Sequence, residues 1–255
     1  AHFNKSLALL DGCKFAEGWK EYEWRWKSPT SGATPFPSLL PLWDGSTTSG
    51  QLLVWAEQGV GDEILYASML PQLRAKVEKL VVLMDRRLLP LFRRSFADID
   101  FLPKDIPPPA GIADMQISMG GLARHLRTGL ADFPTTAAGY LKADPARTER
   151  FKSTFGGSRL CGLAWMSKNV RFCDSKSIRL KDLLPVLKLP GMACVDLQYG
   201  DTLAERTELL ASEGIKLHHL DNLDNFNDLD GLASLIAACD VIVTTSNVTV
   251  HIAGA

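Results

Sequence analysis

The sequence lacks the features that mark several common classes of protein. Its apolar runs all stay short of the ~18 residues of a membrane-spanning helix, so no membrane span is expected. Its 28 basic residues nearly balance 29 acidic ones, for a net charge of -1, which disfavours nucleic acid as a partner. The start of the chain carries no basic and apolar export signal, so we expect a cytoplasmic location.

Metal and cofactor patterns are missing as well. The 5 cysteines are odd in number and include no Cys-x-x-Cys pair, which argues against a disulfide framework and a zinc site. Asp228 and Asp230 have Asp-x-Asp spacing, but they precede an amphipathic helix and fit a helix cap better than a metal site. The glycine-rich stretch 56–64 has neither a third glycine nor a P-loop lysine, so neither NAD nor ATP binding is indicated. We expect no metal and no cofactor.

What the sequence has is a repeating alternation of short apolar strands and amphipathic helices, which predicts an α/β fold with parallel sheets. The alternation begins beyond Gly50, with one helix expected at residues 61–76 after the first strand. It breaks at residues 145–158 and then restarts, with residues 215–220 expected to form one of the later strands. Helical spacing before it predicts a hairpin of two helices, followed by a linker rich in Pro, Ser, Thr and Gly. The predicted parts are a hairpin (1–27), a linker (28–50) and two Rossmann-like lobes (51–150 and 151–255).

A pair of such lobes predicts a ligand at the carboxyl ends of the strands, so the residues just after the strands are the candidates. After the first strand, Gln58, Gly59 and Gly61 form a glycine turn that opens a helix. Asp62, in the first turn of that helix, is a candidate general base for an acceptor hydroxyl, or a helix cap.

In the second lobe, Ser167, Lys168 and Asn169 follow a strand and offer donors to a diphosphate, although exposed lysines are usually only solvated. Ser246, Asn247, Val248 and Thr249 begin the last helix, whose free amides suit a pyrophosphate. His251 lies one turn further along and fits either a phosphate or ribose contact or a core position. Gln198, Tyr199 and Gly200 border a nucleobase, or form a plain strand-to-helix turn.

Several segments together resemble one family. The stretches 12–26, 41–45, 52–73, 162–169, 196–201 and 240–255 resemble, in order and spacing, bacterial tetratricopeptide-containing proteins whose catalytic part is similar to the heptosyltransferases, glycosyltransferase family 9 in the broad sense. EGWKEYEWRW and EQGVGDE are the most specific parts of the resemblance.

The resemblance implies a GT-B fold, with the nucleotide-sugar held mainly by the second lobe and the acceptor mainly by the first. It implies inverting, metal-independent transfer, with Asp62 as the base and Lys168 with Ser246, Asn247 and Thr249 near the diphosphate. His251 matches the family's histidine in that helix. The hairpin would be the last of a stack of tetratricopeptide repeats, and the acceptor a glycan, a lipid-linked sugar or a protein.

Two departures from the family leave other functions open. Many relatives have an acidic residue followed by Thr where this chain has Ser246 and Asn247, and they continue beyond Ala255, so the second lobe is expected to be incomplete. One alternative is an inactive, transferase-like adaptor beside tetratricopeptide repeats. Another is a nucleotide-sugar epimerase of the same fold, which needs no acceptor.

Overall fold

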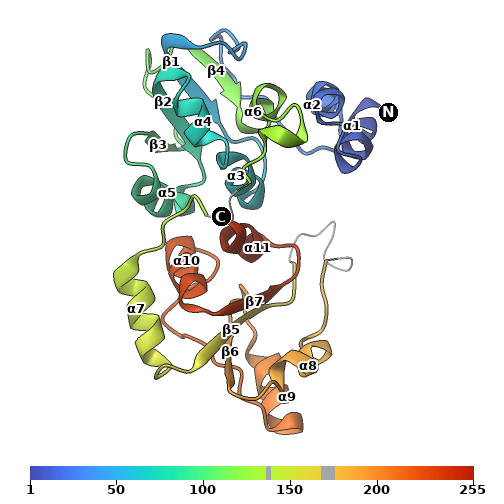
Figure 1. The fold of residues 1–255 in the computed structure, drawn as a ribbon, viewed down its shortest axis with the longest axis vertical. Coiled ribbons are helices and arrows are strands. Elements are labelled where there is room, and N and C mark those ends of the chain that lie inside the picture. Colours follow the sequence, from blue (N-terminus) through green and yellow to red (C-terminus); the bar gives the residue numbers. More distant parts are fainter. Residues whose placement is uncertain (136–138, 168–175) are drawn as a thin grey trace. The chain divides into compact units, whose positions relative to one another are not determined.

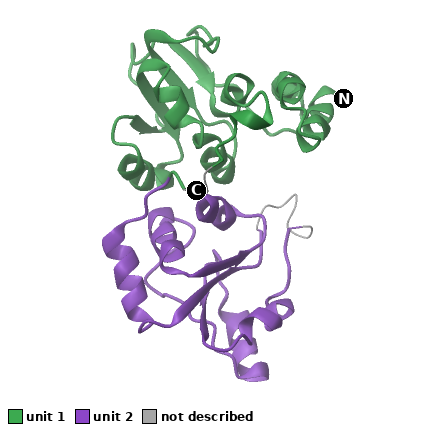
Figure 2. Cartoon of the chain, viewed as in Figure 1, with its two compact units in different colours: residues 1–140 green, residues 141–255 purple. Residues whose placement is uncertain are grey.

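The computed structural model describes residues 1–135, 139–167 and 176–255. The chain divides into two compact units, Ala1–Tyr140 and Leu141–Ala255, which Figure 2 colours separately. The finer division into hairpin, linker and two lobes stays a prediction. Lys168 and Asn169 lie outside the described residues.

Unit 1 opens with the predicted pair of helices, α1 (His2–Asp11) and α2 (Phe15–Tyr22), followed by the 3-10 helix η1 (Glu23–Lys27). The two helices approach closely at Gly18, where an added Cβ would lie 2.7 Å from the Leu10 side chain. α2 also packs on α6, beside which it lies in Figure 1. The relation of this hairpin to tetratricopeptide repeats stays a prediction.

The core of unit 1 is a four-stranded parallel sheet of order β3-β2-β1-β4. Its strands are β1 (Thr48–Trp55), β2 (Val77–Met84), β3 (Asp100–Pro103) and β4 (Met115–Ser118). Leu52, Leu53 and Val54 in β1 are at most 1% exposed. Such continuous apolar runs are typical of parallel strands that are covered on both faces.

Helices follow β1, β2 and β4, as the alternation predicts. They are α3 (Val60–Ala67), α4 (Leu70–Arg74), η2 (Arg86–Leu88), α5 (Leu89–Ser95), α6 (Met119–Leu126) and η3 (Leu130–Asp132). The single helix expected from Gly61 to Lys76 was wrong, because it divides into α3 and α4. Pro71 has no N–H for the Ala67 carbonyl, and its ring would clash with that carbonyl in a continuous helix.

Unit 2 contains a three-stranded parallel sheet of order β6-β5-β7. Its strands are β5 (Arg159–Ala164), β6 (Met192–Asp196) and β7 (Val241–Thr244). Its helices are α7 (Pro145–Thr154), η4 (Leu180–Leu183), α8 (Leu184–Leu187), α9 (Leu203–Glu213), α10 (Leu229–Ala238) and α11 (Val248–Gly254). The predicted α/β fold with parallel sheets is therefore confirmed in both units.

Two local predictions in unit 2 were wrong. The break expected at residues 145–158 is mostly helix α7, because the Asp144 side chain caps its start by accepting from Ala146 N at 2.8 Å and Pro145 fits its first turn. The strand expected at residues 215–220 is reduced to one bridge between Val195 and His218, since the chain turns at Asp221. Among the helices described, none has the length and apolar character needed to span a membrane.

Candidate functional site

The carboxyl ends of the central strands are the expected place for a ligand in each unit. In each sheet the strand that comes first along the chain lies between two others: β1 lies between β2 and β4, and β5 lies between β6 and β7. Later strands are added on both sides of it, which creates a topological switch point. The register pairs Trp55 with Ser118 at the ends of β1 and β4, and Ala164 with Thr244 at the ends of β5 and β7. All the sequence-predicted site residues that the structure describes follow β1, β5, β6 or β7.

In unit 1, Asp62 lies half-buried in the first turn of α3 and caps that helix. Its Oδ2 accepts a hydrogen bond from Gly59 N at 3.2 Å. Burial, helped by the neighbouring Tyr22 and by the charge of Asp62, raises the pKa of the Tyr66 hydroxyl. The cap seen here and a role as base are compatible, because a carboxylate has two oxygens that can accept protons.

The glycine turn before α3 contacts the N-terminal hairpin. Gln58 Nε2 donates to the Tyr22 hydroxyl at 2.7 Å, and the Tyr66 hydroxyl donates to the same oxygen at 3.2 Å. Gly59 is exposed and extended, and Gly61 is half-buried. The turn and α2 therefore form one hydrogen-bonded assembly.

A buried ion pair that sequence reasoning missed occupies the switch point of unit 1. Arg25, which is 0% exposed, places Nη2 3.1 Å from Glu57 Oε1 and donates to Ser118 Oγ at 2.8 Å. Glu57 Oε2 accepts from Gly120 N at 3.3 Å. Burial raises the pKa of the Glu57 carboxyl, and the Arg25 charge opposes that shift.

The sequence contained a signal for this pair. Arg25 lies in EYEWRW and Glu57 in AEQG, two of the most specific stretches of the family resemblance. The structure brings the two residues into contact, and the guanidinium also lies 4.0 Å from the centre of the Trp26 ring and 4.6 Å from that of Tyr22. Removing either charge would leave the other buried and unpaired.

A second buried carboxylate holds the neighbouring loop. Glu63 is 1% exposed, and its Oε1 accepts from Lys104 Nζ at 2.6 Å. Its Oε2 accepts from Asp85 N at 2.8 Å. Burial raises the pKa of the Glu63 carboxyl against the opposing charge of Lys104. Glu57 and Glu63 thus have structural partners, which leaves Asp62 as the more accessible carboxylate of this segment.

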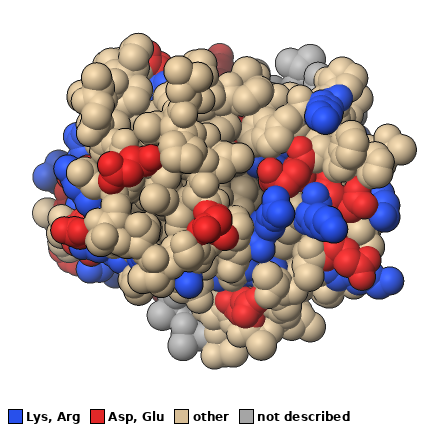
Figure 3. All heavy atoms as spheres, turned by 90° about the horizontal axis from the view of Figure 1, so that it is seen from above, with Lys and Arg blue, Asp and Glu red and all other residues tan. Residues whose placement is uncertain are grey.

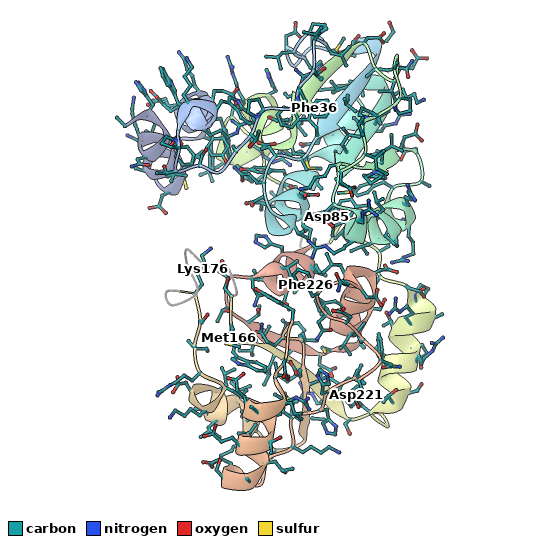
Figure 4. The ribbon with its side chains drawn as sticks, turned by 180° about the vertical axis from the view of Figure 1, so that it is seen from behind. Phe36, Asp85, Met166, Lys176, Asp221 and Phe226 are labelled. Carbon is teal, nitrogen blue, oxygen red and sulfur yellow. The ribbon has the colours of Figure 1, made fainter. Side chains whose placement is uncertain are left out.

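In unit 2, the predicted donor segments after β5 and β7 contact each other. Asn247 Nδ2 donates to Met166 O at 3.2 Å, and Asn247 Oδ1 accepts from Thr249 N at 2.9 Å, which caps α11. Figure 4 labels Met166, the residue just before Ser167. Ser167 is 7% exposed and donates its N–H to Ser177 Oγ at 3.0 Å.

The start of α11 combines accessible and buried polar groups. Ser246 is exposed, while Val248 and His251 are half-buried. Thr249 is 0% exposed, and neither its hydroxyl nor that of Thr245 has a hydrogen-bond partner among the described residues. Buried polar groups are nearly always paired in folded proteins, so these two hydroxyls stand out.

The turn after β6 is fixed by buried side chains. Gln198 is 1% exposed, and its Oε1 accepts from Trp165 N at 3.0 Å and Met166 N at 2.8 Å. Its amide therefore positions the loop that leads to Ser167. The half-buried Tyr199 ring lies 6.0 Å from that of Phe226, and Gly200 has a positive φ of 87°, which favours glycine.

Asp196, at the end of β6, is a second group that sequence reasoning missed. It is 1% exposed and accepts from Thr202 Oγ1 at 2.5 Å and Gln198 N at 2.8 Å. The His219 ring Nδ1 lies 3.0 Å from its Oδ2. Burial raises the pKa of the Asp196 carboxyl, and these contacts oppose the shift. The cluster holds the turn that carries Gln198, Tyr199 and Gly200.

Comparisons with known proteins give one curated relative and several solved structures with a similar fold. No family model matches the chain. Protein FlbA of Caulobacter vibrioides is 30% identical over 274 aligned positions, which cover 99% of this chain and 46% of FlbA. The chain therefore spans about half the length of this curated relative.

Solved structures share the arrangement of strands and helices. Escherichia coli ADP-heptose lipopolysaccharide heptosyltransferase II matches 80% of this chain and 81% of its own, with a TM-score of 0.55 and 15% identity. The iron-containing dodecameric glycosyltransferase TibC of enterotoxigenic E. coli matches 82% of this chain and 56% of its own, with a TM-score of 0.52 and 11% identity. The chain has the heptosyltransferase fold. At these identities the likeness concerns the fold alone.

Proposed function

We propose that this chain is the catalytic part of a glycosyltransferase that moves a sugar from a nucleotide-diphosphate-sugar to a hydroxyl acceptor. The observation that carries the proposal is the contact between the segments after β5 and β7, at the switch point of a sheet with the heptosyltransferase fold. Binding at such a point is general among parallel α/β sheets. The two units would be the lobes of a GT-B enzyme, with a glycan, lipid-linked or protein acceptor.

The donor diphosphate would bind the start of α11. The Val248 amide, the Ser246 hydroxyl and the buried Thr249 hydroxyl provide donors there, and Lys168 supplies positive charge in the same proposal. His251 would contact a phosphate or the ribose, and Gln198, Tyr199 and Gly200 would border the base.

Asp62 would act as the general base. Its carboxylate takes the proton from the acceptor hydroxyl while that oxygen forms a bond to the anomeric carbon. The bond from the anomeric carbon to the diphosphate oxygen breaks at the same time, and the diphosphate leaves with the electron pair. Attack opposite the leaving group inverts the anomeric centre. No step requires a metal.

The test is acceptor-dependent transfer by Asp62→Asn and by a matched control. Asp132 occupies the same third position of a capping box, accepting from Gly129 N at 2.9 Å in η3. Asp62→Asn should lower the transfer rate by at least about 100-fold, since general-base catalysis contributes about 10²–10⁴. Asp132→Asn should leave it near wild type.

Equal loss in both variants would reduce Asp62 to a helix cap. Conversion of the nucleotide-sugar into its epimer without any acceptor would favour the epimerase instead. The adaptor alternative requires that no nucleotide-sugar is consumed under any condition.

A further inference from the structure

Unit 1 contains a cavity that the proposed function does not use. Its volume is about 590 Å³, within the range of about 300–1,000 Å³ that is typical of small-molecule sites. It lies among η1, residues 35–44 of the linker, the ends of β1 and β4, and α6. The residues that line it include neither Asp62 nor the glycine turn before α3.

Aromatic rings form the walls of this cavity. The Trp26 and Phe36 rings lie 5.5 and 5.7 Å from that of Trp55, and both are half-buried, so part of each ring is accessible. Phe36 is labelled in Figure 4, where it lies beside the strands of unit 1. Trp55 is held rigidly, because its Nε1 donates to Gln116 Oε1 at 2.5 Å.

The far wall is also fixed. The Trp43 ring, which is 3% exposed, lies 5.3 Å from the His125 ring of α6. Its indole Nε1 donates to Ser46 O at 2.8 Å. The rings are therefore positioned before any ligand arrives, which lowers the entropic cost of binding.

Polar groups of both hydrogen-bonding types accompany these rings. The side chains of Arg124 and His125 line the cavity, and neither has a hydrogen-bond partner among the described residues. Burial and the nearby Arg124 charge lower the pKa of His125, so its neutral ring offers one donor and one acceptor near pH 7. The carboxylates of Glu23 and Asp44 line the cavity as well.

We propose that this cavity binds a carbohydrate, with the C–H face of a pyranose ring against Phe36 and its hydroxyls bonded to Asp44, Arg124 and His125. An aromatic face is negative and attracts C–H groups, while hydroxyls need donors and acceptors together. Glu23 is paired with Arg25 at 2.8 Å, so Asp44 and Arg124 supply charges of opposite sign that favour a neutral ligand. The inference concerns unit 1 and does not depend on transferase activity.

Saturation-transfer NMR on the full chain tests the proposal. The probes are the methyl glycosides of glucose, galactose and mannose, and N-acetylglucosamine, each at millimolar concentration. Sorbitol is the matched control ligand, because it has similar hydroxyls but no rigid C–H face. We expect transfer to the ring C–H protons of at least one pyranoside, and none to sorbitol.

Substitutions in the lining of the cavity test whether the sugar binds there. Phe36→Ala removes a wall, and Arg124→Ala removes an exposed donor without disturbing the core. Each should weaken binding by about tenfold or more, as expected for the loss of one stacking or charged hydrogen-bonding contact. Arg150→Ala, at an exposed position in α7, is the control and should bind normally.

Three outcomes would overturn the inference: no transfer to any of the four sugars, equal transfer to sorbitol, or unchanged binding by both pocket variants. The proposed function is judged separately, because nucleotide binding by Phe36→Ala and Arg124→Ala can be measured on the same samples. If the cavity does not bind sugars, nucleotide binding should still be observed. If nucleotides do not bind, sugar binding in the cavity should still be observed.

Discussion

Arg25 and Glu57 illustrate how a few buried side chains join the N-terminal hairpin to the sheet of unit 1. Both charges have been removed from water, which costs several kcal/mol per ion and is offset only by good pairing. Arg25 has that pairing, with Glu57, Ser118 Oγ and Tyr22 O as hydrogen-bond acceptors and Trp26 beneath it.

We predict that Arg25→Met destabilises the protein by about 3–5 kcal/mol, because Glu57 is left as an unpaired buried charge. Urea unfolding measures the change. The double variant Arg25→Met with Glu57→Gln should recover part of the loss, since it removes both charges. Lys27→Met, on an exposed residue of the same 3-10 helix, is the control and should change little. A loss below about 1 kcal/mol in Arg25→Met would contradict the inferred strength of the pair.

Glu63 gives a prediction about pH. Its carboxyl pKa is raised above the ordinary value of 4.5. The folded state therefore binds more protons than the unfolded state between these two pKa values, so the contribution of Glu63 to stability is present below pH 4.5 and is lost as the pH rises through the folded pKa.

Glu63→Gln removes this dependence while keeping an oxygen that can accept from Asp85 N. We expect wild type to lose stability relative to Glu63→Gln as the pH rises above about 4.5. Urea unfolding across that range measures the difference. The exposed Glu78→Gln should track wild type at every pH. A wild type that gains on Glu63→Gln with rising pH would contradict the shift.

At the scale of elements, two capped helices differ in whether their first residues belong to the proposed donor site. Asn247 caps α11 and Asp144 caps α7, each by accepting from main-chain N–H groups. Only Asn247 lies in a proposed donor segment and bonds across to Met166 O.

We predict that Asn247→Ala and Asp144→Ala each cost about 0.5–2 kcal/mol of stability, as lost caps do. Only Asn247→Ala should also weaken nucleotide binding, by about tenfold, because it releases the β5 loop and the start of α11 together. Calorimetric titration with the nucleotide that stabilises wild type measures both variants. Equal nucleotide affinities of the two variants would show that Asn247 does not contribute to the donor site.

The elements were largely predictable because buried parallel strands read as apolar runs. Residues 52–55, 80–84 and 160–164 are such runs, and each forms a strand. Helix α7 was missed because its apolar periodicity is weak, although Asp144 followed by Pro145 is a strong start signal. Near His218 the error was the reverse, because a strand was predicted and only one bridge forms. An apolar run alone does not determine where a chain turns.

The site was predictable only in part. Residues that follow strands can be located from the sequence, which is why Asp62, Ser167 and Asn247 could be named as candidates. The pairs Arg25 with Glu57 and Asp196 with His219 join residues far apart in the sequence, so their contact depends on the tertiary fold. The cavity beside Trp55 likewise required the linker to return along β4, where Leu42 bridges to Gln116.

At the scale of the whole molecule, the chain has nearly equal numbers of basic and acidic residues, 28 and 29. Acidic and basic side chains lie interspersed on the face drawn in Figure 3, in keeping with the net charge of -1. Such a surface gives no strong field to gather a highly charged polymer. Recognition of a ligand would therefore depend on local sites, for which each unit offers a candidate.

A thermal-shift panel of UDP, GDP, ADP and CMP on the full-length natural protein tests the central claim most directly. A nucleotide at ~100 times its dissociation constant should add about 2.7 kcal/mol, which is a shift of several degrees for a protein of this size. We predict that one nucleotide stabilises the wild type and the Asp144→Ala variant, and stabilises Asn247→Ala less. No shift with any of the four would contradict the transferase and favour the adaptor.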